Sequence, residues 1–327
     1  MTTIIKMRAP GMTFGRMSLT VWSVFITAIL VLFGTPVLTS ALIMLILDRH
    51  MGTTFFTNDG QPLLYQHLFW FYSHPAVYIM ILQGFAIINE LVTVHSRKHI
   101  FGYKAIGFSS VAIAMLGFMV WGHHMFISGQ SEFSSMVFSF ITFFIGIPSG
   151  IKIFNWIGTM YKGSIQYSSA MLFSIGFLSL FLIGGITGVF FAAVPVDFAL
   201  HDTYFVVSHF HYTMSIGSTF GILAGVYFWF PKMFGRLMDE RWGKVHFFFT
   251  FLFLNGTFYP MHILGAVGFP RRLADPYHYQ TFAHLQPMNQ FMTICAIGMV
   301  SVQVIFAVNF FYSIFFGPAV GRNPWNA

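Results

Sequence analysis

The amino-acid sequence predicts an all-α membrane protein, a bundle of eight transmembrane helices, on the strength of three observations. Only 8% of the 327 residues are charged, whereas about 25% are charged in a typical soluble domain. Hydrophobic residues make up 56% of the chain, and the mean hydropathy is +0.73. They form continuous runs that lack the alternation of a membrane β-strand. Because so few charges could not cover a soluble protein of this size, we predict a single integral-membrane domain over residues 1–327.

Eight apolar runs are long enough to be helices that cross a bilayer. A hydrocarbon core about 30 Å thick requires about 20 helical residues. The predicted spans are 18–47, 67–94, 104–128, 134–160, 169–195, 203–231, 245–268 and 289–317. The connections between these spans are short, so no soluble domain is expected.

The distribution of lysine and arginine predicts the direction of each span. Twelve of the 16 basic residues lie before the first span, after the last span or in alternate connections, and Lys152 lies inside a span. The opposite side carries only Arg49, Arg271 and Arg272. By the positive-inside rule, both termini are expected on the cytoplasmic side. Because the basic residues are scattered singly, no nucleic-acid partner is expected, and the one cysteine, Cys295, excludes a disulfide within the chain.

Five histidines fall at one depth when the spans are oriented in this way. His74 lies early in the second span, His123 and His124 lie late in the third, and His209 and His211 lie early in the sixth. All five are therefore expected in the outer part of the membrane. A single histidine in a span commonly makes a hydrogen bond between helices. Five at one depth, where an ionisable group costs several kcal/mol, indicate ligands of metal or haem.

The spacing of these histidines indicates which of them share a ligand. His209 and His211 lie two residues apart, so their side chains point about 200° apart on a helix and suit two large planar cofactors on opposite sides of it. His123 and His124 lie about 100° apart and can both reach one small ion. Together with His74 they form a three-nitrogen set with a coordination position left open. Imidazole ligands without sulfur or carboxylate suit copper, among other metals.

Two further polar residues lie in positions that suggest proton chemistry. Tyr78 follows His74 by four residues and therefore shares its helix face; it is either an ordinary aromatic neighbour or a redox or proton donor. Lys152 lies too deep in the fourth span to reach water easily, and Ser149 and Thr142 precede it on the same span. This file of polar groups predicts a proton path from the cytoplasmic side. The alternative is a lysine that extends to the inner interface.

Several motifs together closely resemble subunit I of the haem–copper oxygen reductases, the cytochrome c oxidase family. They are MRAPGM, HPAVY, WGHHMF, IPSGIKIFNW, HDTYFVVSHFHY and GFPRRLADPY, and they extend over essentially the whole chain. The resemblance implies reduction of dioxygen to water with cytochrome c as electron donor, coupled to proton pumping. It also implies that the eight spans correspond to the last eight of the family's twelve core helices. We expect a multi-pass protein of the prokaryotic plasma membrane, with the mitochondrial inner membrane as the alternative.

The resemblance assigns a role to each candidate ligand. His74, His123 and His124 match the three ligands of the copper ion CuB. His209 matches the axial ligand of the high-spin haem, for which we expect the a type, and His211 matches an axial ligand of the low-spin haem. Phe210 lies between these two ligands, and Tyr78 matches the tyrosine that the family cross-links to its first CuB histidine.

The resemblance also covers the groups around the metals. Lys152, with Ser149, matches the lysine-bearing proton channel. His201 and Asp202 match a Mg²⁺ site that the family shares with subunit II. Arg271 and Arg272 match a pair that binds haem propionates, which suits cationic side chains in an outer loop.

Two departures from the family pattern stand out. Ala76 occupies the place of the usual glutamate, and Tyr72 and Ser73 precede it, as in a prokaryotic subtype in which hydroxyl groups replace that carboxyl. In addition, four core spans of the family have no counterpart here, and they carry the second histidine of the low-spin haem. We therefore expect a partner chain with those spans, besides subunit II with CuA and subunit III. The other histidines considered for that ligand are His50, His67 and His262.

Three rival functions share some of these features. A quinol oxidase has the same core, and His201 and Asp202 favour cytochrome c over quinol only mildly. A relative of the nitric oxide reductases should carry glutamates near the second metal and lack Tyr78. A non-catalytic, truncated membrane subunit is the rival of a different class.

Overall fold

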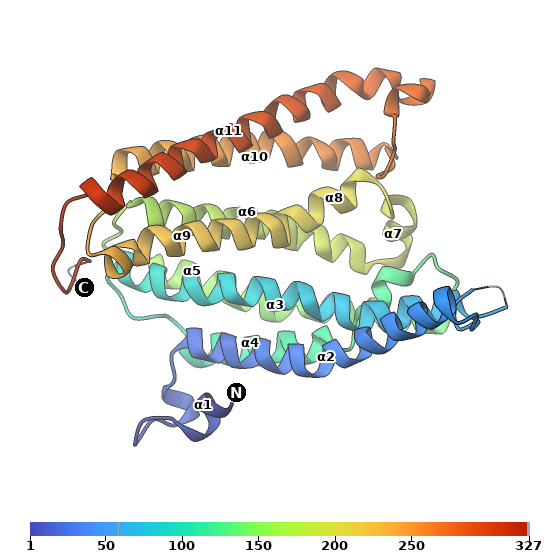
Figure 1. Cartoon of the computed structure of the whole chain (residues 1–327), viewed down its shortest axis with the longest axis horizontal. Coiled ribbons are helices and arrows are strands. Elements are labelled where there is room, and N and C mark those ends of the chain that lie inside the picture. Colours follow the sequence, from blue (N-terminus) through green and yellow to red (C-terminus); the bar gives the residue numbers. More distant parts are fainter. Residues whose placement is uncertain (58, 326–327) are drawn as a thin grey trace. The chain divides into compact units, whose positions relative to one another are not determined.

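Long apolar helices make up most of the protein. The computed structural model describes residues 1–57 and 59–325, apart from the side chains of residues 215 and 216. Within this part of the chain, seven helical segments are long and apolar enough to cross a membrane (Figure 1). They are α2 (Leu19–His50), α3 (Pro62–Ser96), α5 (Glu132–Met160), α6 (Ser169–Ala192), the segment Tyr204–Phe234, α10 (Glu240–Ala266) and the segment Gln280–Phe316 that contains α11 (Gln286–Phe316). The prediction of an all-helical membrane protein is confirmed.

The predicted span 104–128 differs from the other seven. Its α-helix, α4, covers only Tyr103–Gly117, and a 3₁₀ turn, η2, follows at Trp121–Met125. Fifteen residues of α-helix rise about 22 Å, which is less than the hydrocarbon thickness. Glycine has low helix propensity, and a Cβ atom at Gly117 would lie 2.9 Å from the ring of Tyr78. The predicted count of eight long spans is therefore not confirmed in the described part of the chain, because the α-helix of this segment ends at Gly117.

The structure divides into two compact units, of which the first comprises residues 1–86, 101–155 and 188–198. Within it, α2 lies along α4 (Figure 1). Gln83 of α3 donates a hydrogen bond to the hydroxyl of Thr27 on α2 at 2.9 Å. The hydroxyl of Tyr103, at the start of α4, donates to the carbonyl of Met17. These polar contacts fix the helices that surround the histidines of the first unit.

The second unit comprises residues 87–100, 156–187 and 199 onward. In it, α10 and α11 lie side by side (Figure 1). His246 of α10 pairs with Gln303 of α11 at 3.0 Å, and Asn309 of α11 donates to the carbonyl of Asp239, the N-cap of α10, at 2.9 Å. These two contacts satisfy polar side chains between apolar helices, as a membrane interior requires.

The segment that carries the HFHY motif changes its helical form along its length. It begins as α8 (Tyr204–Phe210), continues as a π turn, η3 (His211–Ser215), and becomes α9 (Ile216–Phe234). The hydroxyl of Thr203 accepts a hydrogen bond from the backbone N–H of Phe205 and caps α8. Single π turns inside α-helices are frequently found at functional sites.

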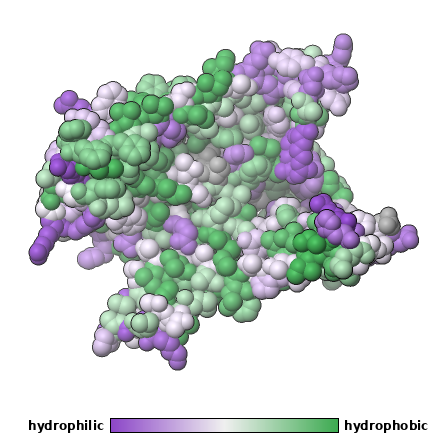
Figure 2. Space-filling view, in the orientation of Figure 1, coloured by the Kyte–Doolittle hydropathy of each residue, from purple (hydrophilic) through white to green (hydrophobic). Residues whose placement is uncertain are grey.

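Large apolar side chains cover much of the helix surface. Figure 2 shows broad hydrophobic areas on the visible face. On α11 the side chains of Ile294, Val300, Val304 and Phe315 are each more than 60% exposed. A soluble protein rarely exposes apolar patches of this extent, whereas lipid covers them without cost. The chain is a multi-pass membrane protein.

Candidate functional site

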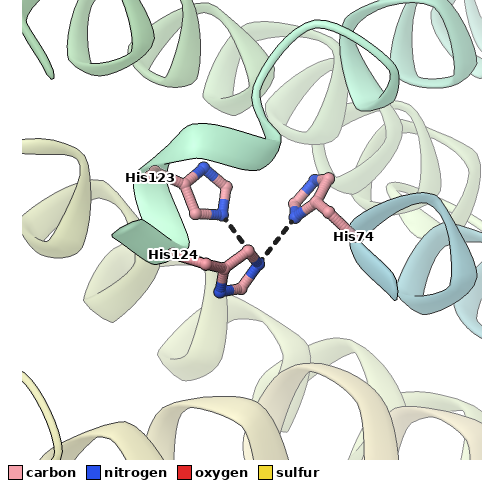
Figure 3. Close-up of side chains that lie close together, drawn as sticks. All are labelled: His74, His123 and His124. Carbon is pink, nitrogen blue, oxygen red and sulfur yellow. Dashed lines mark hydrogen bonds between the residues drawn. The ribbon is translucent and has the colours of Figure 1, made fainter. Parts of the chain in front are cut away.

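Three imidazole rings in the first unit point their nitrogens at one another. His74 comes from α3, and His123 and His124 come from η2 (Figure 3). Nδ1 of His74 lies 3.1 Å from Nε2 of His124, which lies 3.2 Å from Nε2 of His123. Two nitrogens bound tetrahedrally to one metal ion at about 2.0–2.1 Å would lie roughly 3.3 Å apart. Two of the three nitrogen pairs are therefore spaced as ligands of one ion, and all three ligand nitrogens lie within 4.8 Å of one another.

The hydrogen bonds of Thr142 establish which nitrogen of His123 carries a proton. The threonine hydroxyl donates its one hydrogen to the carbonyl of Phe138 at 2.6 Å. Its oxygen, 3.1 Å from Nδ1 of His123, must then accept a hydrogen bond from that nitrogen. The lone pair of His123 is left on Nε2, the atom that faces the other two rings. Such an outer hydrogen bond is the usual way in which a protein orients a histidine toward a metal.

The other two histidines are held by aromatic neighbours. The ring of Trp70 stacks on His124 at 3.7 Å between centroids, with 9° between the planes. His74 is only 4% exposed, and its Nε2 has no hydrogen-bond partner among the residues that the structure describes. The ring of Tyr78 lies edge-on to His74 at 4.8 Å. An all-imidazole site fits copper bound by nitrogen, and the orphaned Nε2 of His74 is the atom not directed at the other two histidines.

Glycines allow the close approach that this site needs. A Cβ atom at Gly122, inside the WGHHM turn, would lie 2.2 Å from the ring of Phe138 on α5. The turn can therefore approach α5 closely enough for His123 to reach Thr142. In a 3₁₀ turn consecutive side chains point about 120° apart, more than the α-helical angle expected from the sequence, and both histidines still face His74.

Lys152 is fully buried on α5 and does not extend to an interface. Its Nζ donates hydrogen bonds to the carbonyl of Ile106 at 3.1 Å and to Oγ of Ser110 at 2.5 Å. Sequence reasoning did not identify Ser110. The available signal was the pair of adjacent serines, Ser109 and Ser110, in an otherwise apolar run. Of the predicted partners of Lys152 on its own helix, Thr142 is bonded to His123 about 15 Å farther along α5.

Tyr72 and Ser73 lie on α3 in the same turn as His74. The ring of Tyr72 packs against Gly34 of α2, where a Cβ atom would lie 3.1 Å from it. Both side chains are partly buried. The two hydroxyl-bearing residues therefore stand directly before the first histidine of the three-nitrogen set.

In the second unit, His209 faces α6. Its Nδ1 lies 3.0 Å from the carbonyl of Gly184 and 3.1 Å from the hydroxyl of Thr187. A carbonyl oxygen can only accept, so Nδ1 carries the hydrogen and Nε2 keeps the lone pair. His209 therefore presents the nitrogen that a haem iron would bind.

His211 faces a different helix, α10. Its Nδ1 donates to the carbonyl of Val207 at 2.7 Å, which again leaves the lone pair on Nε2. The ring of His211 stacks on that of Phe258, with 4.1 Å between the ring centroids. The ring of the preceding residue, Phe210, lies 4.5 Å from that of His211. The two histidines of the HFHY motif thus have separate supports, as the two-residue spacing predicts.

The remaining predicted site residues include a charged cluster that lies just before the first residue of α8. Nε of Arg271 donates to the carboxylate of Asp202 at 2.6 Å, and the backbone N–H of Arg271 donates to the carbonyl of Asp202 at 2.8 Å. A terminal nitrogen of Arg272 lies 3.6 Å from the same carboxylate. His201 precedes Asp202, which has a positive φ of 55°. The structure therefore brings Asp202, one of the predicted Mg²⁺ residues, against the predicted propionate-binding arginines from a separate loop.

The fold and these sites define a multi-pass membrane protein with a three-histidine arrangement suited to a metal and two further histidines whose Nδ1 atoms donate to backbone carbonyls. A protein-family model described as cytochrome c and quinol oxidase polypeptide I matches residues 1–298. The chain belongs to this family.

The relatives agree with that membership. The chain is 52% identical over 328 residues to cytochrome c oxidase subunit 1 of Synechocystis sp., covering 100% of this chain and 59% of the relative. It is 47% identical to that of Thermostichus vulcanus over 99% of this chain and 58% of the relative, and 44% identical to that of Bacillus subtilis over 100% and 52%. The chain thus spans 52–59% of the length of these relatives.

A solved structure has the same fold. It is a heme-copper terminal oxidase dimer determined by cryo-EM, with a TM-score of 0.81 and 21% sequence identity. The match covers 94% of this chain and 58% of that chain.

Proposed function

We propose that this chain is the catalytic part of a terminal oxidase that reduces dioxygen to water, takes electrons from cytochrome c and pumps protons. The convergence of three imidazole nitrogens beside Tyr78 carries this proposal. The relatives at 44–52% identity, each named cytochrome c oxidase subunit 1, support it. When bound, haem iron and copper would supply the binding of dioxygen and the transfer of electrons.

The ligand nitrogens can be assigned from the hydrogen bonds. We assign CuB to Nδ1 of His74 and to Nε2 of His123 and His124, the three atoms that face one another. Nε2 of His209 would hold the high-spin haem, of the a type, and Nε2 of His211 the low-spin haem. The second imidazole of the low-spin haem would come from a partner chain. Subunit II with CuA and subunit III would complete the complex.

Tyr78 is the proposed donor of a proton and an electron at the metal site. Its ring lies against His74, whose Nε2 has no other partner among the described residues. This arrangement supports the cross-link that the family resemblance implies. A bond from a ring carbon of Tyr78 to Nε2 would replace one C–H and one N–H bond, and the oxidase reaction would take up the two electrons released.

Protons would reach the site from the cytoplasmic side through Lys152 and the hydroxyl of Ser110. Ser149 and Thr142 are the further proposed groups of this path, and Thr142 also holds His123. Tyr72 and Ser73 would replace the carboxyl that the family usually carries next to the metal. A buried hydroxyl can pass a proton because it both donates and accepts.

The charged cluster of Asp202, Arg271 and Arg272 would bind haem propionates and Mg²⁺ at the outer face. Arg271 and Arg272 would hold haem propionates, because bidentate guanidinium groups suit carboxylates. His201 and Asp202 would bind Mg²⁺ together with subunit II. Since the carboxylate of Asp202 already pairs with both arginines, the two sites would share one network of charge.

Both termini are proposed to lie on the cytoplasmic side of the prokaryotic plasma membrane, with the chain as one integral-membrane domain. The charge distribution of the connections carries this topology. Relatives from bacteria support the location.

A quinol oxidase is the second candidate, because the matching family model includes quinol oxidases. The test is to purify the native complex, determine its haems by pyridine haemochrome, measure copper, and follow oxygen consumption with reduced cytochrome c and with quinol. Two haems, one CuB and faster turnover with cytochrome c are expected. Faster turnover with quinol would favour the second candidate. A complex without haem and copper would overturn the catalytic proposal in favour of a non-catalytic subunit.

A further inference from the structure

The segment that carries His209 and His211 is attached to two helices through two different faces. On one face, His209 bonds to Gly184 of α6, and a Cβ atom at Gly184 would lie 2.7 Å from the side chain of Thr213. On the other face, the ring of His211 stacks on Phe258 of α10. The hydroxyl of Tyr212 donates to Asn255 of α10 at 2.8 Å. Each histidine can therefore be disturbed separately.

A buried serine and a buried histidine lie on the α10 face of this segment. Ser208 is fully buried and His262 is 8% exposed. Oγ of Ser208 lies 2.7 Å from the carbonyl oxygen of Phe258 and 2.8 Å from Nδ1 of His262. The carbonyl can only accept, so the one hydrogen of the hydroxyl goes to it. Nδ1 of His262 must then carry a hydrogen and donate it to Ser208.

This pair lies where α8 and α10 cross with their backbones in contact. A Cβ atom at Gly265, three residues after His262, would lie 1.9 Å from the backbone nitrogen of Phe205, three residues before Ser208. The close approach brings α10 within reach of a side chain as short as serine. The carbonyl of Phe258, which Ser208 contacts, belongs to the residue whose ring supports His211. The hydrogen-bonded pair and the stacked ring therefore act on the same turn of α10.

We propose that Ser208 and His262 are a pair of positioning residues that set the orientation of the His211 ring. The hydrogen bond from Nδ1 of His262 to Ser208 fixes the rotation of α8 against α10 and with it the plane of the imidazole. This inference rests on the proposed role of His211 as a ligand of the low-spin haem. Because His209 is held by α6, the pair acts on the low-spin haem and leaves the high-spin haem unchanged.

The test compares the two haems in the purified complex with Ser208→Ala. The low-spin haem is followed by its absorption in the reduced-minus-oxidised spectrum and by its electron paramagnetic resonance, which depends on the orientation of the ligand plane. The high-spin haem is followed by its carbon monoxide difference spectrum. The low-spin signals should shift, and the carbon monoxide spectrum should keep its shape. Ser174→Ala is the matched control, since Ser174 is buried and its hydroxyl bonds within its own helix to Ala170 at 2.9 Å.

Variants of His262 separate a hydrogen bond from mere packing. His262→Asn keeps an N–H donor near the place of Nδ1 and should restore the native low-spin signals. His262→Leu removes the donor and should reproduce the shift of Ser208→Ala, with no further shift in the double variant. If Ser208→Ala does not assemble, the low-spin signals of His262→Asn and His262→Leu test the proposal. It requires native signals in the first variant and shifted signals in the second. Unchanged low-spin signals, or equal shifts of both haems, would overturn the proposal.

His211→Ala distinguishes the two levels of the inference. A low-spin haem that survives this change would overturn the assignment of His211 itself. Loss of the low-spin haem in His211→Ala, together with native signals in Ser208→Ala and His262→Leu, would overturn only the positioning pair.

Discussion

The hydroxyl of Thr142 on α5 and Nδ1 of His123 in the η2 turn lie 3.1 Å apart, and the threonine hydrogen is already given to the carbonyl of Phe138. This relationship fixes His123 in one tautomer and directs its Nε2 toward His74 and His124. A residue predicted as part of a proton path is therefore also the support of a candidate metal ligand.

Thr142→Val should weaken copper binding. The substitution keeps the shape of the side chain but removes the acceptor that Thr142 offers to Nδ1 of His123. Loss of such an outer hydrogen bond typically costs about 10–100-fold in metal affinity. Copper per complex, measured against a series of chelator concentrations, checks this. Thr142→Ser, which keeps the hydroxyl, should retain native affinity, and copper retention by both variants alike would contradict the supporting role.

His124→Ala should remove copper and abolish oxygen consumption, with both haems largely retained. One of three converging nitrogens is lost, and the ring that stacks on Trp70 is lost with it. Elemental analysis and the haem spectrum of one preparation test both halves of the statement. Full copper content with normal turnover would remove His124 from the proposed site.

Gly117→Ala should destabilise the complex by about 1–3 kcal/mol, the usual cost of overpacking. The new methyl group would meet the ring of Tyr78 at 2.9 Å, so the tyrosine must move away from its place beside His74. Gly107→Ala in the same helix is the control, because no atom lies within 4 Å of its Cβ position. Thermal unfolding followed by haem absorption should separate the two, and equal midpoints would contradict the contact.

The sequence was sufficient to bring His74, His123 and His124 together. The lengths of the apolar runs predicted the spans, and the basic residues predicted their direction. With that direction, the histidines were expected at one depth. The helical spacing within HFHY likewise predicted separate surroundings for His209 and His211. These features follow from periodicity and topology, which are local properties of a membrane sequence.

The break in the predicted span 104–128 could not be predicted in the same way. Gly117 stands in an apolar run without proline or a polar cap. A glycine is needed there because the ring of Tyr78, on another helix, leaves no room for a Cβ atom. The pairing of Lys152 with Ser110 is equally a matter of which helix faces which. Single-sequence patterns give the face of a helix but do not identify its neighbour, so these contacts required the structure.

His209→Ala and His211→Ala should separate the two haems. His209→Ala should remove the high-spin signal that binds carbon monoxide, whereas His211→Ala should disrupt the low-spin spectrum. The reason is that each holds its Nδ1 on a carbonyl and directs its Nε2 from a different side of the segment. Optical spectra with and without carbon monoxide check this, and the reversed pattern in well-assembled complexes would exchange the assignments.

Ser110→Ala should slow turnover by impairing proton uptake through Lys152. The buried Nζ has two acceptors among the described residues, and the substitution removes the nearer one. Leaving a buried polar group without its partner costs about 1–3 kcal/mol, so the lysine should change its position or its protonation. Oxygen consumption and the rate of proton uptake after a single electron addition would both fall, while haem and copper contents remain native.

Ser109→Ala is the matched control for this last prediction. Ser109 is also buried and donates to the same carbonyl, that of Ile106, at 2.8 Å, as Ser110 does at 3.0 Å. Among the described residues, the Nζ of Lys152 donates to Ile106 and Ser110 and not to Ser109. If proton uptake depends on the hydrogen bond between Ser110 and Lys152, only Ser110→Ala should slow it. Native rates in both variants would mean that the proton reaches Lys152 by a route that does not use the hydroxyl of Ser110.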